Sequence, residues 1–457
     1  MDTGITGVTT LHGFVRDGRL RARSRPQMTH SDDPNETSPE VPATPATRLP
    51  DLGSRKDRGR RFLFFSNELI GLGHLRRTLS IANRLAEVEP DSSSLIVTGS
   101  PVVPWFGMPP RVDILKLPGW TRDEHGDRKA GGLALDVSGL HAVRSGIELA
   151  VATSFDADVA VVDKLPLGPG GELTEALEAL RGLPRCRVVL GLRDIDDAPD
   201  QVRRAWGPDM RAAIERYYDA ILVYGPASSP DAIRSVGWTD LTVPVHHVGY
   251  LGWPMTDEPA PDLPDGYLLA TVGGGHDGYR VLEEVLQAIR LEPLGCPTLV
   301  ITGPLMPKAQ IQALRSLAAG TDAQVVEFRG DMDRVLAGAR AVVGMAGYNT
   351  VAETLRARRP ALLVPRARPS QEQLVRARAV AQQPSYAMLH PDDLDPRAMR
   401  EALGRLLDAP QPDAPPDEYE GADTSAQLLS GLADAPRARR HVPHRAARAQ
   451  APSREHG

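Results

Sequence analysis

Residues 342–377 read VVGMAGYNTVAETLRARRPALLVPRARPSQEQLVRA, and this stretch decides the fold. An apolar run at 341–343 predicts a buried strand, which Gly344 and Gly347 end. Residues 350–358 then show the apolar spacing of a helix. A strand–glycine–helix junction points several backbone N–H groups and a helix N-terminus at one place, which suits a phosphate group.

The same junction carries a carboxylate one helical turn further on. Glu353 is placed to accept hydrogen bonds from the ribose of whatever carries the phosphate. Gly347, Tyr348, Asn349 and Thr350 precede it and would supply N–H groups and a hydroxyl to a diphosphate. The stretch therefore predicts a nucleotide-sugar site.

Outward from this stretch, apolar strands and amphipathic helices alternate in two series. The alternation predicts an α/β fold with two Rossmann-like, parallel-sheet domains at residues 59–248 and 266–410. Residues 249–265 are dense in Pro and Gly, which predicts a hinge. Two such domains hold a ligand at the carboxyl ends of their sheets. We therefore expect an N-terminal acceptor domain to face a C-terminal donor domain across a cleft.

The two ends of the chain differ from this pattern. Residues 1–58 are rich in Pro, Thr, Ser, Asp and Arg and show no apolar periodicity, so they are predicted to be a disordered leader, and Met28 is an alternative start to Met1. Residues 411–435 are predicted to be a linker and a helix. Residues 436–457 are basic and predicted to be disordered, with weak attraction to an anionic membrane surface.

Composition excludes several classes of protein. The chain has 457 residues, 41% of them hydrophobic, and a formal net charge of -6, which argues against nucleic acid as the partner. Its two cysteines, Cys186 and Cys296, lie in apolar runs, so buried free thiols in a reducing compartment are expected. No apolar run reaches the about 18 residues of a membrane span, and the N-terminus lacks the apolar core of a secretion signal. We therefore expect a cytoplasmic protein.

A histidine near the start of the first domain is the candidate catalytic residue. His74 follows Gly71 and Gly73 at a strand-to-helix turn, where the glycines let the backbone approach a ligand. An imidazole there could remove a proton from an attacking hydroxyl, or it could only satisfy the turn. Arg77 is predicted to lie on the surface of the following helix. Asp163 ends a later strand, so it either faces the cleft or forms a structural pair.

A second glycine turn and two polar pairs complete the predicted donor site. Gly274 and Gly275 lie in a Gly-Gly-Gly turn after an apolar strand, without the spacing of the dinucleotide fingerprint. Phe328 and Arg329 are predicted to end a strand, with a base packed on the ring of Phe328 and bonded to the backbone of Arg329. Later in the chain stand the residues that could bind the hydroxyls of a donor sugar, Glu372 and Gln373.

Two polar stretches of the first domain are harder to interpret. Residues 121–137 are polar, contain glycine and lack periodicity, which predicts a long loop. Asp194 and Asp196 form an Asp-x-Asp sequence, but such a pair is common in loops and has no further ligands at metal-site spacing. We therefore predict no metal site.

Together these motifs resemble those of the GT-B glycosyltransferases. They are Gly-x-Gly-His-x-x-Arg at 71–77, Gly-Gly-Gly at 273–275, Val-x-Glu-Phe at 325–328 and GMAGYNTVAE at 344–353. The resemblance spans residues 61–408. Within the fold, the chain is similar to the family 28-like N-acetylglucosaminyltransferases of peptidoglycan synthesis, and more closely to predicted actinobacterial glycosyltransferases. This implies twin Rossmann-like domains, a donor bound mainly by the C-terminal half, and no essential metal.

The resemblance also implies roles for individual residues. His74 matches the cleft histidine, residues 347–350 the diphosphate loop, and Glu353 the ribose-binding acid. Gly275-His276 replaces the usual Ser-Gln after the donor-side glycines. Glu372 and Gln373 match the sugar-contacting pair, although Glu372 stands where the peptidoglycan enzymes have Gln. The acceptor-side loops do not match, so a peptidoglycan intermediate is not implied as the acceptor.

These observations predict a metal-independent hexosyltransferase. Its donor is expected to be a nucleoside-diphosphate sugar with uracil as the base, and no separate cofactor is expected. Its acceptor is a small molecule, a glycan or a lipid-linked molecule. One alternative is a nucleotide-sugar hydrolase of the pseudaminic acid pathway type, which shares the Gly-x-Gly-His-x-x-Arg turn and in which His74 would activate water. The other is a non-catalytic protein that binds sugar nucleotides.

Overall fold

The structure is a computed structural model that describes residues 58–66, 73–100, 108–122, 128–253, 255–413 and 419–435. Residues 51–457 form one compact unit, and every feature below lies within it. The predicted leader, except for Arg58, the predicted basic tail and Gly71 lie outside the described residues.

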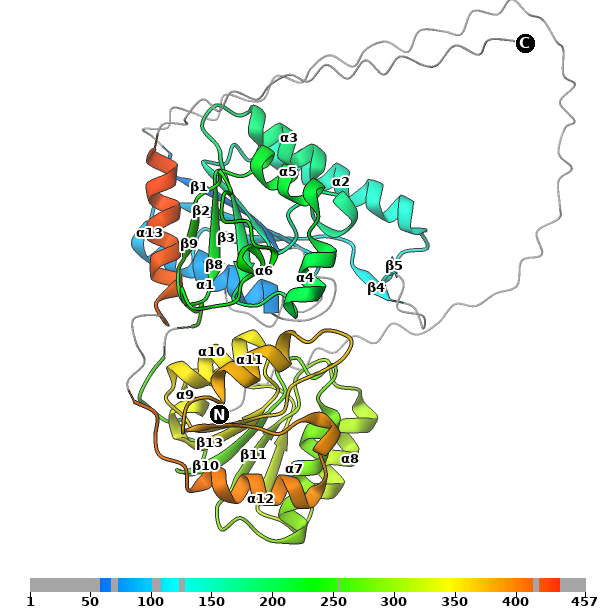
Figure 1. The fold of residues 1–457 in the computed structure, drawn as a ribbon, viewed down its shortest axis with the longest axis vertical. Coiled ribbons are helices and arrows are strands. Elements are labelled where there is room, and N and C mark those ends of the chain that lie inside the picture. Colours follow the sequence, from blue (N-terminus) through cyan, green and yellow to red (C-terminus); the bar gives the residue numbers. More distant parts are fainter. Residues whose placement is uncertain are drawn as a thin grey trace, which may run out of the picture. The chain divides into compact units, whose positions relative to one another are not determined.

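The N-terminal domain is built on a parallel seven-stranded sheet with the order β3-β2-β1-β6-β7-β8-β9. Its strands are β1 (Arg61–Ser66), β2 (Ser93–Thr98), β3 (Val112–Lys116), β6 (Val159–Asp163), β7 (Arg187–Arg193), β8 (Ala220–Tyr224) and β9 (Val245–His247). Its helices are α1 (Gly73–Val88), α2 (Val137–Ser154), α3 (Thr174–Gly182), α4 (Pro199–Ala205), α5 (Pro208–Tyr217) and α6 (Ala232–Val236). The central strands are buried along their length, as expected where helices cover both faces (Figure 1).

The C-terminal domain repeats this plan with a parallel six-stranded sheet of order β12-β11-β10-β13-β14-β15. Its strands are β10 (Tyr267–Thr271), β11 (Thr298–Ile301), β12 (Ala323–Val326), β13 (Ala339–Gly344), β14 (Ala361–Leu363) and β15 (Tyr386–Met388). Its helices are α7 (Tyr279–Leu291), α8 (Lys308–Ala318), α9 (Met332–Gly338), α10 (Tyr348–Arg356), α11 (Glu372–Val380) and α12 (Pro396–Leu407). The predicted α/β architecture with two Rossmann-like domains is confirmed.

The strand orders determine where a ligand can bind. In the first sheet the order reverses between β1 and β6, and in the second between β10 and β13. Ligands of open parallel sheets bind at the carboxyl ends of the strands beside such a reversal. The turn that leads from β1 to α1 and the turns that follow β6, β10 and β13 are therefore the places to look for a site.

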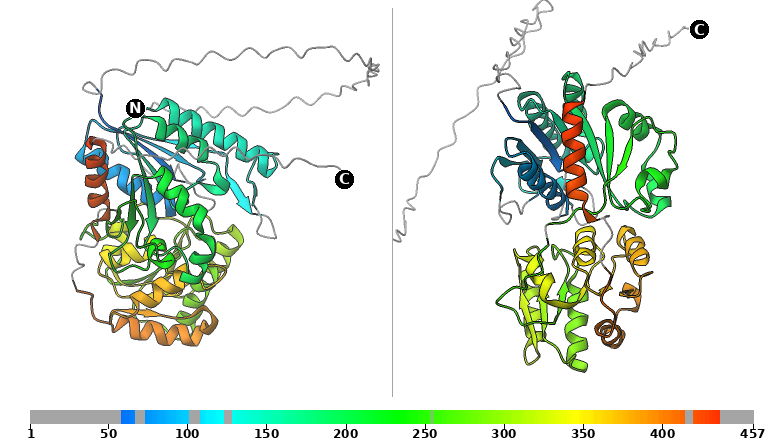
Figure 2. Two further views of the ribbon diagram at one scale, coloured as in Figure 1. Left: turned by 45° about the horizontal axis from the view of Figure 1, so that its top comes forward. Right: turned by 90° about the vertical axis from the view of Figure 1, so that its left-hand side faces the viewer.

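The last described helix, α13 (Gly421–Asp434), packs on the N-terminal domain although it follows the C-terminal domain in sequence (Figures 1 and 2). Its apolar face, including Ala426 and Leu429, is buried against Leu75 and Leu79 of α1. A Cβ at Gly421 would lie 2.6 Å from the backbone oxygen of Gly249, so this close approach requires glycine.

Three local predictions from the sequence are wrong. Residues 121–137 are not one loop, because β4 (Trp120–Arg122) and β5 (Arg128–Ala130) pair as an antiparallel ribbon. The sequence of residues 199–217 predicts one helix, but the structure has two, α4 and α5. They are separated before Pro208, whose ring cannot continue a helix but suits the first position of the next one. β12 ends at Val326, so Phe328 and Arg329 lie in the loop after the strand.

The structure also describes the two cysteines and the length and apolar character of each helix. Both cysteines are free thiols, Cys186 buried and Cys296 half-buried. Among the described residues, no helix is both long enough and apolar enough to cross a membrane.

The packing of α13 predicts the effect of a truncation in its apolar face. Leu429→Ala removes a fully buried side chain and should lower the free energy of unfolding by about 2–5 kcal/mol. Gln427→Ala, on the exposed face of the same helix, should change it by less than about 0.5 kcal/mol. Urea unfolding followed by circular dichroism measures both, and equal effects of the two substitutions would contradict the packing described here.

Candidate functional site

A cavity of about 1050 Å³ is lined by residues of both domains. Its lining includes every predicted site residue that the structure describes: Gly73, His74, Gly274, Gly275, Phe328, Arg329, Gly347, Tyr348, Asn349, Thr350, Glu353, Glu372 and Gln373. Residues separated by up to about 300 positions thus meet at one cavity because both sheets reverse their strand order there.

The donor-side glycine turn is held in a backbone conformation that other residues rarely adopt. Gly273 and Gly275 follow β10 with φ of 64° and 86°. A Cβ at Gly275 would lie 2.2 Å from the carbonyl oxygen of Thr302, so the turn packs directly on the neighbouring backbone. The turn therefore lines the cavity without side chains at 273–275, and a ligand can approach its backbone.

Two helix N-termini, one from each domain, reach this cavity. α10 begins after Gly347, whose position carries no side-chain cap, so the first N–H groups of the helix have no partner from a cap. α1 begins at Gly73, and the side-chain amide of Asn349 lies 3.5 Å from the carbonyl oxygen of Gly73. Helix N-termini carry partial positive charge, so both favour an anion in the cavity.

His74 is held by a carboxylate from a neighbouring strand. The Nδ1 atom of His74 lies 2.6 Å from Oδ2 of Asp163, which ends β6 beside β1 in the sheet. Arg77 donates to the same oxygen at 3.0 Å, and it is 3% exposed rather than on the surface as predicted. Because Asp163 accepts a hydrogen bond from Nδ1–H, the Nε2 atom of His74 is the ring nitrogen left to act as an acceptor.

The same neighbours set the charge state of this pair. Burial lowers the pKa of His74 to about 4, while Asp163 raises it and Arg77 lowers it. Burial disfavours the ionised form of Asp163, yet Arg77 and His74 bring the pKa of Asp163 to about 2. At neutral pH the pair is therefore a neutral imidazole oriented by an ionised carboxylate, which is the arrangement of an oriented general base.

Glu353, the predicted ribose acid, is paired across the two domains. Its Oε1 atom lies 2.7 Å from Nη2 of Arg76 on α1. Burial raises the pKa of Glu353, and Arg76 lowers it. The side chain lies at the cavity as predicted, but a ribose would have to share it with a guanidinium or displace that guanidinium.

The predicted sugar-contacting pair has two different environments. Both oxygens of Glu372 are bound to arginines, Oε2 to Arg193 at 2.6 Å and Oε1 to Arg376 at 2.9 Å. Against the effect of burial, Arg193 and Arg376 hold the pKa of Glu372 below its ordinary value. Gln373 accepts from the backbone N–H of Arg366 at 3.0 Å, which orients its side-chain amide. The predicted contacts of Glu372 and Gln373 with a donor sugar stay predictions.

One fully buried contact between the domains is an ion pair that the sequence did not indicate. Arg376 binds Asp194 with two hydrogen bonds, Nε to Oδ2 at 2.9 Å and Nη2 to Oδ1 at 2.7 Å. Both side chains are 1% exposed. Arg376 also donates to the carbonyl oxygen of Ala346 at 3.0 Å, next to the residue that precedes α10. Asp194 is the first residue of the Asp-x-Asp sequence considered as a metal site. In the structure both of its carboxylate oxygens bind the guanidinium of Arg376.

The aromatic ring of Tyr348 lies between two of these arginines. The guanidinium carbons of Arg77 and Arg376 are 5.1 Å and 5.8 Å from its ring centroid. Its hydroxyl accepts from the backbone N–H of Leu251 at 2.9 Å. The side chain of Tyr348 thus holds the domains together, while its backbone lies in the first turn of α10.

The residues predicted to bind the base lie on the C-terminal side of the cavity. Phe328 lines it from the loop after β12. The guanidinium of Arg329 donates to both carboxylate oxygens of Asp262, from Nη1 at 2.6 Å and from Nη2 at 2.9 Å. It also donates to the carboxylate of Asp331. The side chain of Arg329 is therefore occupied, and only its backbone fits the predicted contact.

The cavity lining as a whole carries excess positive charge. Six arginines line it, against four carboxylates. Within the described parts of the chain, no group of three or more His, Cys, Asp or Glu side chains is arranged to hold a metal ion. The guanidinium groups and helix N-termini therefore provide the positive charge seen around this cavity.

Comparison with known proteins gives a family match for the C-terminal part of the chain. Residues 269–429 match the glycosyltransferase family 28 C-terminal domain. The chain is 30% identical over 180 residues to the UDP-N-acetylglucosamine–N-acetylmuramyl-(pentapeptide) pyrophosphoryl-undecaprenol N-acetylglucosamine transferase of Rhodospirillum centenum. The match covers 38% of this chain and 47% of that protein, so the chain spans about half the length of this relative.

Two solved structures share the fold. MurG of Acinetobacter baumannii has a TM-score of 0.51 at 14% identity, over 81% of this chain and 99% of that one. UGT2 of Phytolacca americana, solved with UDP-2fluoro-glucose and pterostilbene, has a TM-score of 0.52 at 16% identity, over 82% of this chain and 94% of that one. The GT-B fold and the resemblance to family 28 are confirmed.

The buried pair of Asp194 and Arg376 predicts a large effect on stability. Arg376→Met leaves a buried carboxylate without its partner and should lower the free energy of unfolding by about 3–5 kcal/mol. Arg378→Met, on the exposed side of the same helix, should change it by less than about 0.5 kcal/mol. Urea unfolding measures both variants. The pair would be unimportant if Arg376→Met behaved like Arg378→Met.

Proposed function

We propose that this protein is a metal-independent, inverting glycosyltransferase that transfers a hexose-type sugar from a UDP-sugar to an acceptor hydroxyl. The observation that carries the proposal is the oriented His74–Asp163 pair at a cavity that the glycine turn and the uncapped N-terminus of α10 also line. The family 28 match of residues 269–429 supports donor binding by the C-terminal domain. The name of the Rhodospirillum centenum relative supports UDP as the nucleotide.

In this proposal His74 is the general base. Its Nε2 atom accepts the proton of the acceptor hydroxyl while the hydroxyl oxygen attacks the anomeric carbon of the donor sugar. Asp163 fixes the Nδ1–H tautomer and stabilises the imidazolium that forms. The bond between the anomeric carbon and the diphosphate oxygen breaks with its electron pair on the diphosphate, so the configuration at that carbon inverts.

The departing diphosphate is stabilised by charge that the protein already holds in place. The first turn of α10 and the backbone at 273–275 supply N–H groups, and the arginines of the lining supply positive charge. The anionic donor also affects the base, because negative charge close to His74 favours its protonated form. Donor binding would therefore raise the pKa of His74 from the low value that burial and Arg77 produce.

Loss of the base should reduce turnover without reducing donor binding. His74→Gln should lower kcat by about 10²–10⁴-fold, since it removes the proton acceptor, and leave UDP affinity within about twofold. Asp163→Asn should have an effect of similar size because it releases the tautomer of His74. His246→Gln, a histidine outside the cavity lining, is the control and should be fully active. The assay measures UDP release with a panel of acceptors.

The pH profile and the acceptor dependence give two further readouts of the same assay. Because burial lowers the pKa of His74 to about 4, the free enzyme keeps this base neutral between pH 8 and pH 5.5. The acid limb of kcat/KM should therefore lie below pH 6.5, the ordinary value of histidine. A limb at pH 6.5 or above would contradict the base assignment. UDP release without any acceptor would identify a hydrolase, and tight UDP binding without turnover a binding protein.

Glu353 should contribute to the nucleoside part of donor binding alone. Glu353→Gln removes a carboxylate acceptor and should weaken uridine binding about 10–100-fold, the range of a hydrogen bond to a charged group. Inorganic pyrophosphate contains no ribose, and the substitution releases Arg76 from its carboxylate partner, so pyrophosphate affinity should not fall. Isothermal titration calorimetry measures both, with Glu401→Gln, on the exposed surface of α12, as the control. Unchanged uridine affinity would refute the role of Glu353.

A further inference from the structure

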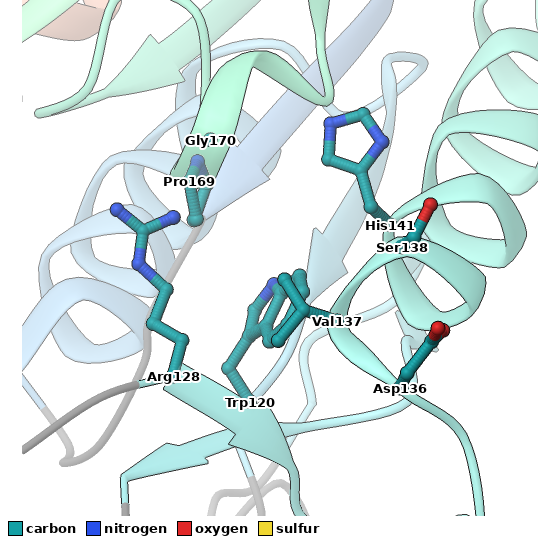
Figure 3. A pocket seen from close by; sticks show the side chains of 8 residues that line it. All are labelled: Trp120, Arg128, Asp136, Val137, Ser138, His141, Pro169 and Gly170. Atoms are coloured by element: carbon teal, nitrogen blue, oxygen red, sulfur yellow. The ribbon is translucent and has the colours of Figure 1, made fainter.

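The N-terminal domain contains a second cavity, of about 520 Å³, that shares no lining residue with the first. It lies between the β4–β5 ribbon, the first turn of α2 and the glycine-rich turn at 168–171 (Figure 3). Its volume is within the range of pockets that bind small molecules, about 300–1,000 Å³. The motifs assigned to the donor and to the base leave this cavity unexplained.

One wall of the cavity is a fixed aromatic ring. The indole Nε1–H of Trp120 donates to Oε2 of Glu172 at 3.2 Å, and Trp120 is 4% exposed. Glu172 is held in turn by Arg144, whose Nε lies 2.9 Å from the same oxygen, and both of these side chains are fully buried. The guanidinium carbon of Arg144 lies 5.9 Å from the centroid of Trp120. This network fixes the orientation of the ring before any ligand binds.

Two nitrogen-bearing side chains face each other across the glycine-rich turn. A Cβ at Gly170 would lie 3.1 Å from Nη1 of Arg128 and 3.7 Å from Cδ2 of His141. Gly170 has a φ of 78°, so both the backbone and these two side chains favour glycine at this position. Figure 3 shows Arg128 and His141 on opposite sides of the pocket, with Trp120 and Val137 between them. The carboxylate of Asp136 is engaged as the cap of α2, accepting from Gly139 N–H at 2.7 Å.

Apolar side chains are exposed in the segment that leads into α2 and in the first turns of that helix, the part of the chain that supplies four of the lining residues. Leu133, Leu135, Val137 and Val143 are each 40–49% exposed, and they are four of the seven large apolar side chains that are exposed among the described residues. Single exposed apolar residues are common, but a group of them beside a pocket is typical of a binding site. Val137 belongs to both the group and the lining of the pocket.

We propose that this pocket is a second ligand site, which binds a small amphipathic anion. The carboxylate or phosphate monoester of the ligand lies between Arg128 and His141, and its apolar or aromatic part packs on Trp120 and Val137. The guanidinium group suits either anion, since it presents paired N–H donors. The site is independent of glycosyl transfer, because it shares no residue with the cavity of the proposed reaction.

Calorimetry of the full chain with two soluble probes, phenyl phosphate and 4-phenylbutyrate, tests the site. Both should bind at millimolar concentration or below, and at least tenfold more tightly than inorganic phosphate or 4-phenylbutanol, which each carry one half of the ligand. Saturating UDP should leave the probe affinity unchanged. Binding that UDP abolishes would place the probes in the donor cavity and overturn the proposal, as would the absence of binding.

Substitutions then locate the probes in the pocket. Arg128→Gln should weaken both probes about tenfold or more, and Trp120→Leu should weaken them by removing the aromatic wall. Arg204→Gln removes an exposed arginine of α4 that does not line the pocket, and should leave their affinity unchanged. Thermal unfolding of each variant verifies that it is folded. If Arg128→Gln is folded and binds the probes as tightly as Arg204→Gln, the proposal is overturned.

Discussion

The buried ion pair between Asp194 and Arg376 is the interaction on which the arrangement of the cleft depends. Removing two such charges from water costs several kcal/mol per ion, so the pair is tolerated only because its geometry is bidentate. The remaining N–H groups of Arg376 bind Glu372 and the carbonyl oxygen of Ala346. One guanidinium thus joins the domains, fixes the first residue of α11 and supports the backbone that leads into α10. The position of the predicted diphosphate loop relative to His74 follows from that set of contacts.

A second consequence concerns charge. The two acids predicted to bind the donor, Glu353 and Glu372, are both paired with arginines of the N-terminal domain. The charges of Arg76 and Arg193 are therefore compensated by carboxylates of the C-terminal domain. A diphosphate offers a guanidinium an alternative partner of higher charge, and a ribose offers Glu353 hydroxyl donors in place of Arg76. Donor binding, as we propose it, would exchange partners among existing charges and would leave none of them buried alone.

The sequence predicted the features whose signals are local. The two sheets, the glycine turns and the helix starts follow from runs of about ten residues, and the glycine turns after β10 and β13 contribute to the cavity as their spacing indicated. The pairings could not be predicted, because Asp163 is 89 positions from His74 and Arg376 is 182 positions from Asp194. Asp163 left a signal, since it ends a strand. The signal of Arg77 was its place in the Gly-x-Gly-His-x-x-Arg motif. Its burial was not predictable, because it packs on Tyr348, a residue of the other domain, and no periodicity within α1 reports such a contact.

The Asp-x-Asp sequence shows why a motif has to be interpreted through its neighbours. Asp194 binds Arg376 with both oxygens, and an oxygen of Asp196 lies 3.5 Å from Nζ of Lys164. A divalent cation at this position would have to displace a bidentate guanidinium that also holds the domains together. The carboxylate of Asp194 therefore contributes to domain packing, while Asp196 pairs within its own domain. In the proposed reaction, the arginines of the cavity lining would supply the positive charge. In this cleft, the same ion pairs that determine the geometry also determine the electrostatics.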